Sequence, residues 1–478
     1  MDLRPVLHIL MRILVISGTA LLTCIPVALI YHEPVLPFVY TAAIVLIMAA
    51  CVYGLRGSTE LSAFHRREAY FSVTLSWLVV SLVGSLPYLF SGAIPTFVNA
   101  FFESVSGFTT TGSSILTDIE SLPKSVLFWR SMTHWIGGLG IIVLVIIIMP
   151  SLNIGGYNLF TLESSFQEKI HPKIKSVGRR LLYIYLSLTL AEIIFLLIGD
   201  MNLYESVCHA FGTVATGGFS PKNTSIGGYS PYIQYVITVF MVLSGVNFVI
   251  HYYAVKRQFH KIRQNEELKF YLFVILFSGF LITGILYFQT DRSFELAFRE
   301  SFFQVASIIT CTGFATADYL LWPAVGWYII FFLMFFGGST GSTAGGIKMA
   351  RHLVALKNVR HTFRMMNAPN AVIPLRINHR PISYQENNGI LTFILWYLML
   401  FLAGGLLMVL LGSDVATAFS SVATAMGGIG PGLGTIGPAS NFAHLSEASK
   451  IALSALMVLG RLEIYTVVML ITPWFWKN

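Results

Sequence analysis

Four short segments of this chain carry residue types that could hold a bare cation. Each is rich in small residues, and glycine closes each one. The four tetrapeptides are Thr109-Thr110-Thr111-Gly112, Ala215-Thr216-Gly217-Gly218, Thr310-Cys311-Thr312-Gly313 and Gly427-Gly428-Ile429-Gly430. Glycine readily adopts the positive φ that turns neighbouring carbonyls toward one axis. A ring of such oxygens can replace the water shell of a monovalent cation, so we predict that the four segments surround one pathway.

The composition is that of a chain that crosses a membrane several times. Of its 478 residues, 55% are hydrophobic and 11% are charged, whereas soluble domains carry about 25% charged residues. Predominantly apolar runs at 35–52, 181–198 and 270–288 are long enough to span a bilayer. We therefore predict an all-α polytopic membrane protein embedded in the lipid bilayer.

The formal net charge is +8, and the charged residues are concentrated in the loops. Basic residues cluster at 56–67, 169–180, 256–263 and 351–364, and the intervening connections are acidic. The positive-inside rule predicts that the basic loops and both termini are cytoplasmic. The acidic outer face should concentrate cations. This pattern indicates topology and no nucleic-acid partner.

Each tetrapeptide stands at the same place in a repeated unit. Two helices at 7–31 and 35–54 come first, and each later unit has a helix, a short half-helix, a loop and a second helix. The predicted half-helices are 96–108, 203–214, 294–309 and 414–426, and the second helices are 126–149, 230–255, 322–355 and 447–472. The resulting divisions are 1–60, 61–165, 166–263, 264–380 and 381–478. Half-helices too short to span must be buried in protein or line water.

Small residues also have a simpler use in membranes. Glycine, serine and threonine let transmembrane helices pack closely, and a single Thr-Thr-Thr-Gly would be weak support for a pore. Four copies, each after a non-spanning segment and before a spanning helix, favour a pathway around one axis. The C-terminal ends of the half-helices would direct partial negative charge toward it.

Four segments of the chain resemble the pore loops of the Trk/Ktr/HKT superfamily of potassium transporters. They read SGFTTTGSS, FGTVATGGFSP, ITCTGFATAD and GGIGPGLG. The extra N-terminal helix pair resembles the TrkH/TrkG branch rather than the shorter KtrB branch. The resemblance implies potassium uptake across the bacterial inner membrane, with K⁺ as the transported ion and no organic cofactor.

By this resemblance, twelve residues line a selectivity filter. They are Thr110, Thr111, Gly112, Thr216, Gly217, Gly218, Cys311, Thr312, Gly313, Gly428, Ile429 and Gly430. In related plant proteins, serine in place of the first loop's glycine goes with sodium preference, so Gly112 favours potassium. Cys311 and Ile429 depart from a threonine-only pattern, which makes side-chain ligation less symmetric around the ring.

A run of small residues interrupts the second helix of the third unit. Its members are Gly337, Gly338, Ser339, Thr340, Gly341, Ser342, Thr343, Gly345 and Gly346. Such a run does not hold a regular helix. Lys348 follows it, and Arg461 is a second cation at membrane depth, where a charge marks a functional site by default. The resemblance implies an intramembrane gating loop with the arginine as a barrier.

Other interpretations of this run stay open. A passive kink explains the glycines but not the cations. A phosphate-binding loop would need lysine where Ile347 stands. An intramembrane serine hydrolase at Ser339 would need a histidine at matching depth, and none is obvious. Apart from this alternative, we expect no enzymatic activity. A proton- or sodium-coupled symporter would need carboxylates on the path, and the four tetrapeptides contain none.

The partners follow from the resemblance alone. Family members form homodimers and bind a ring of cytosolic nucleotide-sensing subunits, so a second copy and a regulatory subunit of the TrkA type are expected here. The chain itself encodes no soluble nucleotide-binding domain.

Overall fold

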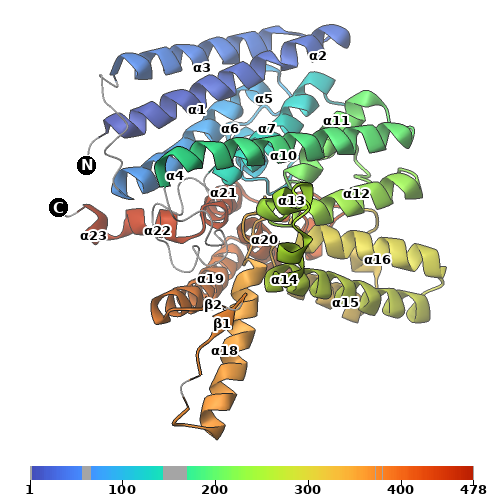
Figure 1. Ribbon diagram of the computed structural model, residues 1–478. Helices are drawn as coiled ribbons and strands as arrows, with labels where there is room; N and C mark the ends of the chain where they lie inside the picture. The colour runs from blue at the N-terminus through green and yellow to red at the C-terminus, as the bar shows by residue number, and fades with distance from the viewer. Residues whose placement is uncertain (1–2, 56–65, 144–169, 372, 379, 477–478) are drawn as a thin grey trace.

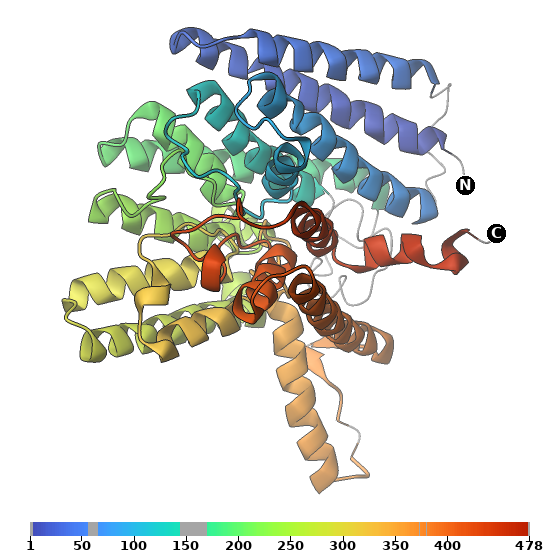
Figure 2. The ribbon, with the colours of Figure 1, turned by 180° about the vertical axis from the view of Figure 1, so that it is seen from behind.

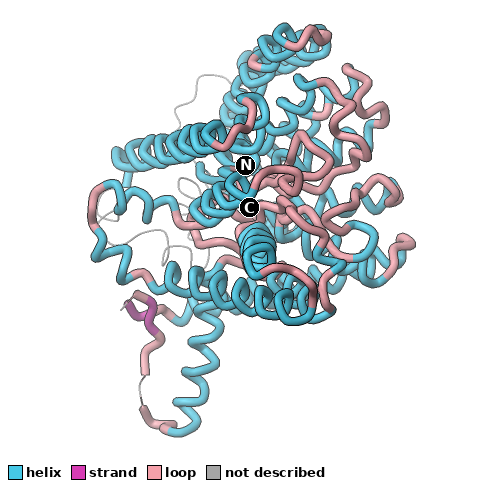
Figure 3. Tube along the Cα trace, turned by 90° about the vertical axis from the view of Figure 1, so that its right-hand side faces the viewer, coloured by secondary structure: helices cyan, strands magenta, loops and turns pink. Residues whose placement is uncertain are grey.

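The structure is a computed structural model that describes residues 3–55, 66–143, 170–371, 373–378 and 380–476. Its regular structure is almost entirely helical, as predicted (Figure 3). Two short strands, β1 (Arg376–Ile377) and β2 (Arg380–Pro381), form an antiparallel pair with Ile377 opposite Arg380.

Three helices form the N-terminal part. They are α1 (Arg4–Leu22), α2 (Cys24–Ile30) and α3 (Leu36–Leu55). Helices α1 and α3 lie side by side along one edge of the molecule (Figures 1 and 2). The predicted pair at 7–31 and 35–54 is therefore present, with a break in the first helix at Thr23.

The next two groups of helices contain the first two tetrapeptides. The first group is α4 (Arg66–Gly84), α5 (Leu86–Phe90), α6 (Phe97–Phe108) and α7 (Lys124–Val143). The second is α10 (Ile170–Ile198), α11 (Leu203–Val214), α12 (Pro231–Ser244), α13 (Phe248–Val255) and α14 (Phe259–Gln264). The rest of the helix predicted at 126–149 lies outside the described residues.

The last two groups contain the other two tetrapeptides. The third group is α15 (Glu266–Gln289), α16 (Phe294–Ile309), η3 (Tyr319–Leu321), α17 (Ala324–Leu333) and α18 (Met349–Asn367). The fourth is α19 (Tyr384–Leu410), α20 (Val415–Gly427), η4 (Gly434–Ile436), α21 (Glu447–Arg461), α22 (Tyr465–Ile471) and α23 (Pro473–Trp476). Helix α18 extends away from the other helices (Figures 1 and 2).

Two further predicted helices are sharply bent. The segment predicted as 230–255 bends by 100° between α12 and α13, and the segment predicted as 447–472 bends by 116° between α21 and α22. Asn247 starts α13 because its side chain accepts a hydrogen bond from the Val249 amide at 2.8 Å. Glu463 and Ile464 have φ values of 60° and 51°, which no helix can continue through.

The arrangement of apolar side chains suits a bilayer. Among the residues that the structure describes, six helices are long and apolar enough to cross a membrane, or up to eight if each bent pair is one span. Long helices expose large apolar residues, such as Phe273 and Phe277 of α15, each 59% exposed. By contrast, the C-terminal halves of the short helices α6, α11, α16 and α20 are buried although they are rich in serine, threonine and glycine. The inside is therefore more polar than the outside, and α1 and α23 start and end the chain on one side of the molecule (Figures 1 and 2).

Candidate functional site

The four short helices end in the same hydrogen bond. In each tetrapeptide the third residue donates its amide to the carbonyl five residues earlier. The pairs are Thr111 to Ser106 at 2.8 Å, Gly217 to Gly212 at 2.8 Å, Thr312 to Ser307 at 2.8 Å and Ile429 to Thr424 at 3.0 Å. This bond is typical of a Schellman motif, which needs a left-handed residue just before the donor.

The four loops also share backbone angles. The second and fourth residues of each tetrapeptide have positive φ. The values are 53° at Thr110 and 83° at Gly112, 56° at Thr216 and 79° at Gly218, 57° at Cys311 and 82° at Gly313, and 67° at Gly428 and 97° at Gly430. Alternation of left-handed and ordinary angles lets successive carbonyls face one side of the chain, as a ring of ion ligands requires.

The sequence did not predict the positive φ at the second residue of each tetrapeptide. We expected left-handed geometry only at the closing glycines, yet three loops place Thr110, Thr216 and Cys311 in it. A non-glycine residue held there costs of order 1–3 kcal/mol, and such strain gathers at functional sites. The helix-ending hydrogen bonds supply the constraint. In the third loop the Thr310 hydroxyl adds bonds to the Ala306 carbonyl and the Thr312 hydroxyl, each at 2.7 Å.

The four loops contact one another in chain order, and the last returns to the first. A Cβ built on Gly112 would lie 2.2 Å from the carbonyl oxygen of Gly217. The other such distances are 2.0 Å from Gly218 to the Thr312 oxygen, 1.9 Å from Gly313 to the Ile429 oxygen and 3.0 Å from Gly430 to the Thr111 oxygen. Each closing glycine thus lies against the third residue of the next loop. All twelve residues predicted for the filter are brought together in one closed ring.

Buried polar contacts support the ring from behind. The Arg130 Nε lies 2.7 Å from the Glu103 Oε1, with both side chains at most 3% exposed. Glu103 also accepts the Ile115 amide at 2.9 Å, and Arg130 donates to the Ser220 carbonyl at 3.0 Å. This ion pair therefore joins helix α6 to the segments after the first and second loops. The sequence analysis did not predict this ion pair, although two opposite charges in apolar segments could have indicated it.

The glycine-rich run is a closed excursion between α17 and α18. Its two ends meet through the Gly337 amide, which donates to the Ile347 carbonyl at 2.9 Å, and the Met349 amide, which donates to the Gly338 carbonyl at 3.2 Å. We call residues 337–348 the intramembrane loop. The predicted interruption of the helix is present, and it is longer than a kink.

The intramembrane loop touches the ends of helices from several units. The Thr343 hydroxyl donates to the Val214 carbonyl at the end of α11 at 3.1 Å, and the Ser339 amide donates to the Gly245 carbonyl at 2.8 Å. A Cβ on Gly345 would lie 2.2 Å from the Gly427 carbonyl at the end of α20. The loop therefore lies next to the ring, against the C-terminal ends of the short helices.

The two predicted cations lie at this loop in different roles. Arg461, which is 5% exposed, donates to the Thr343 carbonyl at 2.8 Å and to the Gly137 carbonyl of α7 at 3.1 Å. Lys348 is 3% exposed and donates to the Ala344 carbonyl within the loop. Arg461 thus joins the loop to the first unit. Together with the contacts to the second and fourth units, the loop of the third unit is connected to all the others.

Ser339 is not placed for nucleophilic chemistry. Its side chain is fully buried, and its hydroxyl has no hydrogen-bond partner among the described residues. A serine nucleophile needs a base within hydrogen-bond reach. The hydrolase interpretation therefore lacks its second residue in the part of the chain that the structure describes.

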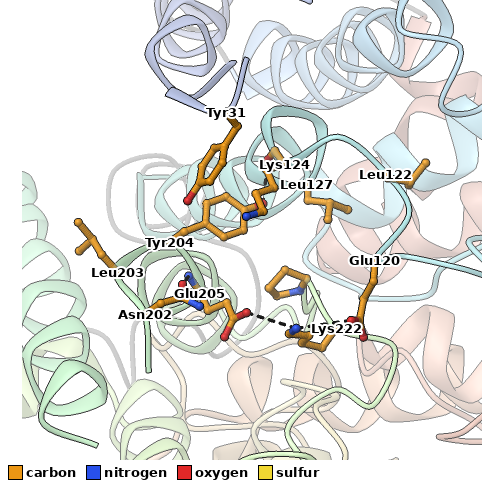
Figure 4. Close-up of a pocket in the computed structure, with 11 residues that line it drawn as sticks. Tyr31, Glu120, Leu122, Lys124, Leu127, Asn202, Leu203, Tyr204, Glu205 and Lys222 are labelled. Carbon is orange, nitrogen blue, oxygen red and sulfur yellow. Dashed lines mark hydrogen bonds and ion pairs between the residues drawn. The ribbon is translucent and has the colours of Figure 1, made fainter. Parts of the chain in front are cut away.

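A cavity of about 430 Å³ lies where residues 120–127 of the first unit and 202–222 of the second meet Tyr31, just after α2 (Figure 4). Inside it, the Lys222 ammonium lies 3.4 Å from a carboxylate oxygen of both Glu120 and Glu205. The attraction of Glu205 raises the pKa of Lys222. The predicted acidic outer face is therefore partly neutralised, and the Glu295–Arg299 and Glu300–Arg292 pairs at 2.8 Å have the same effect.

Comparison with known proteins identifies the family. The family model of TrkH, described as a cation transport protein, matches residues 38–474. The chain belongs to the TrkH family of cation transport proteins. It is thus a multi-pass membrane protein and no enzyme, and the resemblance drawn from the four segments is confirmed. Neither the hydrolase nor the coupled symporter gains support.

The TrkH relatives match over the whole chain. The Trk system potassium uptake protein TrkH of Salmonella typhimurium is 34% identical, and TrkG of Escherichia coli K12 is 32% identical, with 99–100% of each chain covered. The crystal structure of the potassium transporter TrkH from Vibrio parahaemolyticus superimposes with a TM-score of 0.92 at 30% identity, covering 100% of both chains.

Proposed function

We propose that this chain carries potassium ions into the bacterial cell across the inner membrane, through the ring of the four loops. The observation that carries the proposal is the closed contact of each closing glycine with the third residue of the next loop. A ring built in this way presents carbonyl oxygens from all four loops to one ion. The relatives named as Trk potassium uptake proteins support K⁺ as that ion.

The four loops act as the selectivity filter. A K⁺ ion sheds its water and is held by carbonyl oxygens of the twelve ring residues. The short helices end at the ring, so their partial negative charge favours a cation there. The buried Glu103–Arg130 pair keeps the loops in register without placing a carboxylate on the path. Units 61–165, 166–263, 264–380 and 381–478 each supply one quarter of this filter.

The intramembrane loop acts as the gate. It meets the ends of α11 and α20 and is fixed through Arg461, so an ion leaving the ring toward the cytoplasm encounters it. Lys348 and Arg461 place positive charge beside it, which opposes the passage of K⁺. Conduction then requires the loop to move aside.

Two partners complete the proposal. Helix α18 exposes Leu356, Val359, Phe363 and Met366, which are 55–71% exposed and share one face at helical spacing. A second copy of the chain would cover this face in a homodimer. From the basic loops we infer that both termini and α18 are cytoplasmic, where a nucleotide-binding subunit of the TrkA type binds.

The filter is tested by ion discrimination. We expect Gly112→Ser and Gly313→Ser to lower the ratio of K⁺ to Na⁺ uptake in proteoliposomes, because each new Cβ meets a carbonyl oxygen within 2.2 Å. Gly284→Ser is the matched control, since nothing lies within 4 Å of its Cβ position. Unchanged ratios in both filter variants would refute the assignment.

The gate is tested by shortening the intramembrane loop. Removal of residues 341–344 should raise basal K⁺ flux, because the Thr343 contacts to α11 and Arg461 are lost. Flux equal to that of the intact chain, in protein that elutes as a single species, would refute the gate.

A further inference from the structure

Glu267, the second residue of α15, contacts the intramembrane loop at both of its ends. Its Oε1 accepts the Thr340 amide at 2.6 Å and the Ala350 amide at 3.2 Å. Thr340 lies near the start of the loop, and Ala350 lies in the first turn of α18, just after the loop ends. One carboxylate oxygen thus bridges ten residues of chain.

The surroundings of Glu267 make this contact strong. The side chain is 2% exposed, and hydrogen bonds to a charged acceptor are roughly twice as strong as neutral ones. Ala350 carries one of the first amides of α18, which have no partner inside the helix and where negative charge is stabilised. Both amides donate to the same oxygen of this carboxylate. Its geometry is that of a clamp on the loop rather than of a residue exposed to the passing ion.

The preceding residue holds the projecting arm. Glu266 forms an ion pair with Lys357 of α18 and accepts the Asn378 amide at 3.2 Å, while its own amide donates to the Asn378 Oδ1 at 2.9 Å. Lys357 also donates to the Arg376 carbonyl of β1 at 2.8 Å. The start of α15 is therefore bonded to the intramembrane loop through Glu267, and to α18 and the residues around the strand pair through Glu266.

From this arrangement we propose that Glu267 is a positioning residue that holds the intramembrane loop across the pathway, and that Glu266 couples this hold to the arm made by α18 and the strand pair. The proposal rests on the proposed gate. Movement of α18 shifts Ala350 directly and Lys357 with it, so a displacement of the arm strains both carboxylate contacts at once. Breaking the Glu267 bonds frees both ends of the loop.

The test separates the negative charge from the acceptor. Glu267→Ala removes both hydrogen bonds, whereas Glu267→Gln removes the charge and keeps an oxygen that can accept the same two amides. In proteoliposomes of the full chain alone, we expect basal K⁺ flux to rise about tenfold for Glu267→Ala, and less for Glu267→Gln. The ratio of K⁺ to Na⁺ flux should stay that of the intact chain, because the amides that Glu267 accepts belong to the intramembrane loop and α18 and not to the ring.

The matched control is Glu192→Gln. Glu192 is a carboxylate on α10, fully buried like Glu267, but neither of its oxygens has a hydrogen-bond partner in the part of the chain that the structure describes. Its replacement should leave basal flux unchanged. A rise equal to that of Glu267→Ala would show a general effect of altering a buried carboxyl side chain and would overturn the proposal.

A second measurement reads the loop itself and avoids reliance on the alanine variant folding. Ser342, which is 1% exposed, is replaced by cysteine in a Cys51→Ala background, and labelling by a methanethiosulfonate reagent is compared with the same chain lacking the new cysteine. We expect Glu267→Gln to speed labelling of this cysteine. An unchanged labelling rate together with unchanged flux would overturn the proposal.

The outcomes for the gate and for Glu267 can be told apart. If the loop-shortened chain conducts more but the Glu267 variants do not, the gate stands and the positioning role falls. If the loop-shortened chain does not conduct more, the gate itself falls. When both conduct more, the combined variant should match the shortened loop alone, because a loop without residues 341–344 no longer closes the pathway even when Glu267 still holds Thr340 and Ala350; additive increases would overturn the proposal.

Discussion

The ring of four loops and the intramembrane loop are built from similar residues and held in opposite ways. Every loop of the ring ends a helix with the same hydrogen bond and lies against its neighbour's backbone. The intramembrane loop closes on itself and is held to the rest of the protein by the side chains of Thr343, Arg461 and Glu267 together with backbone contacts to Gly245 and Gly427. Backbone packing on all sides makes a fixed structure, whereas a few side-chain contacts can be released together. The comparison teaches that glycine serves close approach in both regions, whereas the charged side chains of Arg461 and Glu267 hold only the intramembrane loop.

The largest effect is expected where the ring is tightest. Gly313→Ala combines a φ of 82° with a Cβ only 1.9 Å from the Ile429 oxygen, so we expect loss of K⁺ selectivity and destabilisation by at least about 3 kcal/mol. Ion flux in proteoliposomes and thermal unfolding in detergent measure the two effects. Full selectivity and an unchanged unfolding temperature would show that the ring is not rigid.

A smaller effect is expected from releasing the second region. Arg461→Met frees the carbonyls of Thr343 and Gly137 and removes a cation, so basal flux should rise several-fold while selectivity is kept. Arg461→Lys keeps the charge but cannot reproduce two fixed donors. Comparison of the two variants separates the electrostatic barrier from the anchoring of the loop. If neither variant changes flux, Arg461 does not hold the gate.

The comparison is sharpened by a substitution within the ring that should be tolerated. Gly428 is left-handed, with a φ of 67°, but the nearest atom to its Cβ position is the Thr110 oxygen at 3.9 Å. Gly428→Ala should therefore cost only about 1–2 kcal/mol and keep K⁺ selectivity. Loss of selectivity equal to that of Gly313→Ala would mean that backbone angle, and not close approach, governs the ring.

The smallest effect is expected at the outer cavity. Lys222→Met breaks the bridge to Glu120 and Glu205, which is partly exposed to solvent and worth less than about 1 kcal/mol. Because the pKa of Lys222 is raised, the bridge is fully present below the usual pKa of lysine and is lost as the pH rises through the raised value. Because the two carboxylates are then no longer neutralised, we expect a slight gain in K⁺ uptake at low ionic strength that disappears at high salt. A gain unaffected by salt would contradict this electrostatic explanation.

The sequence was informative wherever residue type alone limits the backbone. Gly112, Gly218, Gly313 and Gly430 could be assigned positive φ because glycine is the residue that adopts it readily, and the break at 337–346 followed from composition. Left-handed Thr110, Thr216 and Cys311 could not be foreseen, because the surrounding contacts impose an angle that these residues disfavour.

Other features depended on contacts between distant parts of the chain. The bends after Ser244 and Arg461 lie in apolar stretches that read as continuous helices, and the first of them receives the intramembrane loop at Gly245. Glu103 and Arg130 are 27 residues apart, and Glu267 meets partners 73 and 83 residues away. Periodicity and composition contain no information on which of many polar residues will meet across such separations.

The fourth contact of the ring is looser than the other three, with a Cβ distance of 3.0 Å at Gly430 against 1.9–2.2 Å elsewhere. Since all four quarters belong to one polypeptide, a gene-level change alters a single quadrant, whereas the same change in a channel of four identical chains would alter every quadrant at once. Evolution can therefore adjust ion preference here in small, separate increments, and the Gly430 quadrant has the most room in which to begin.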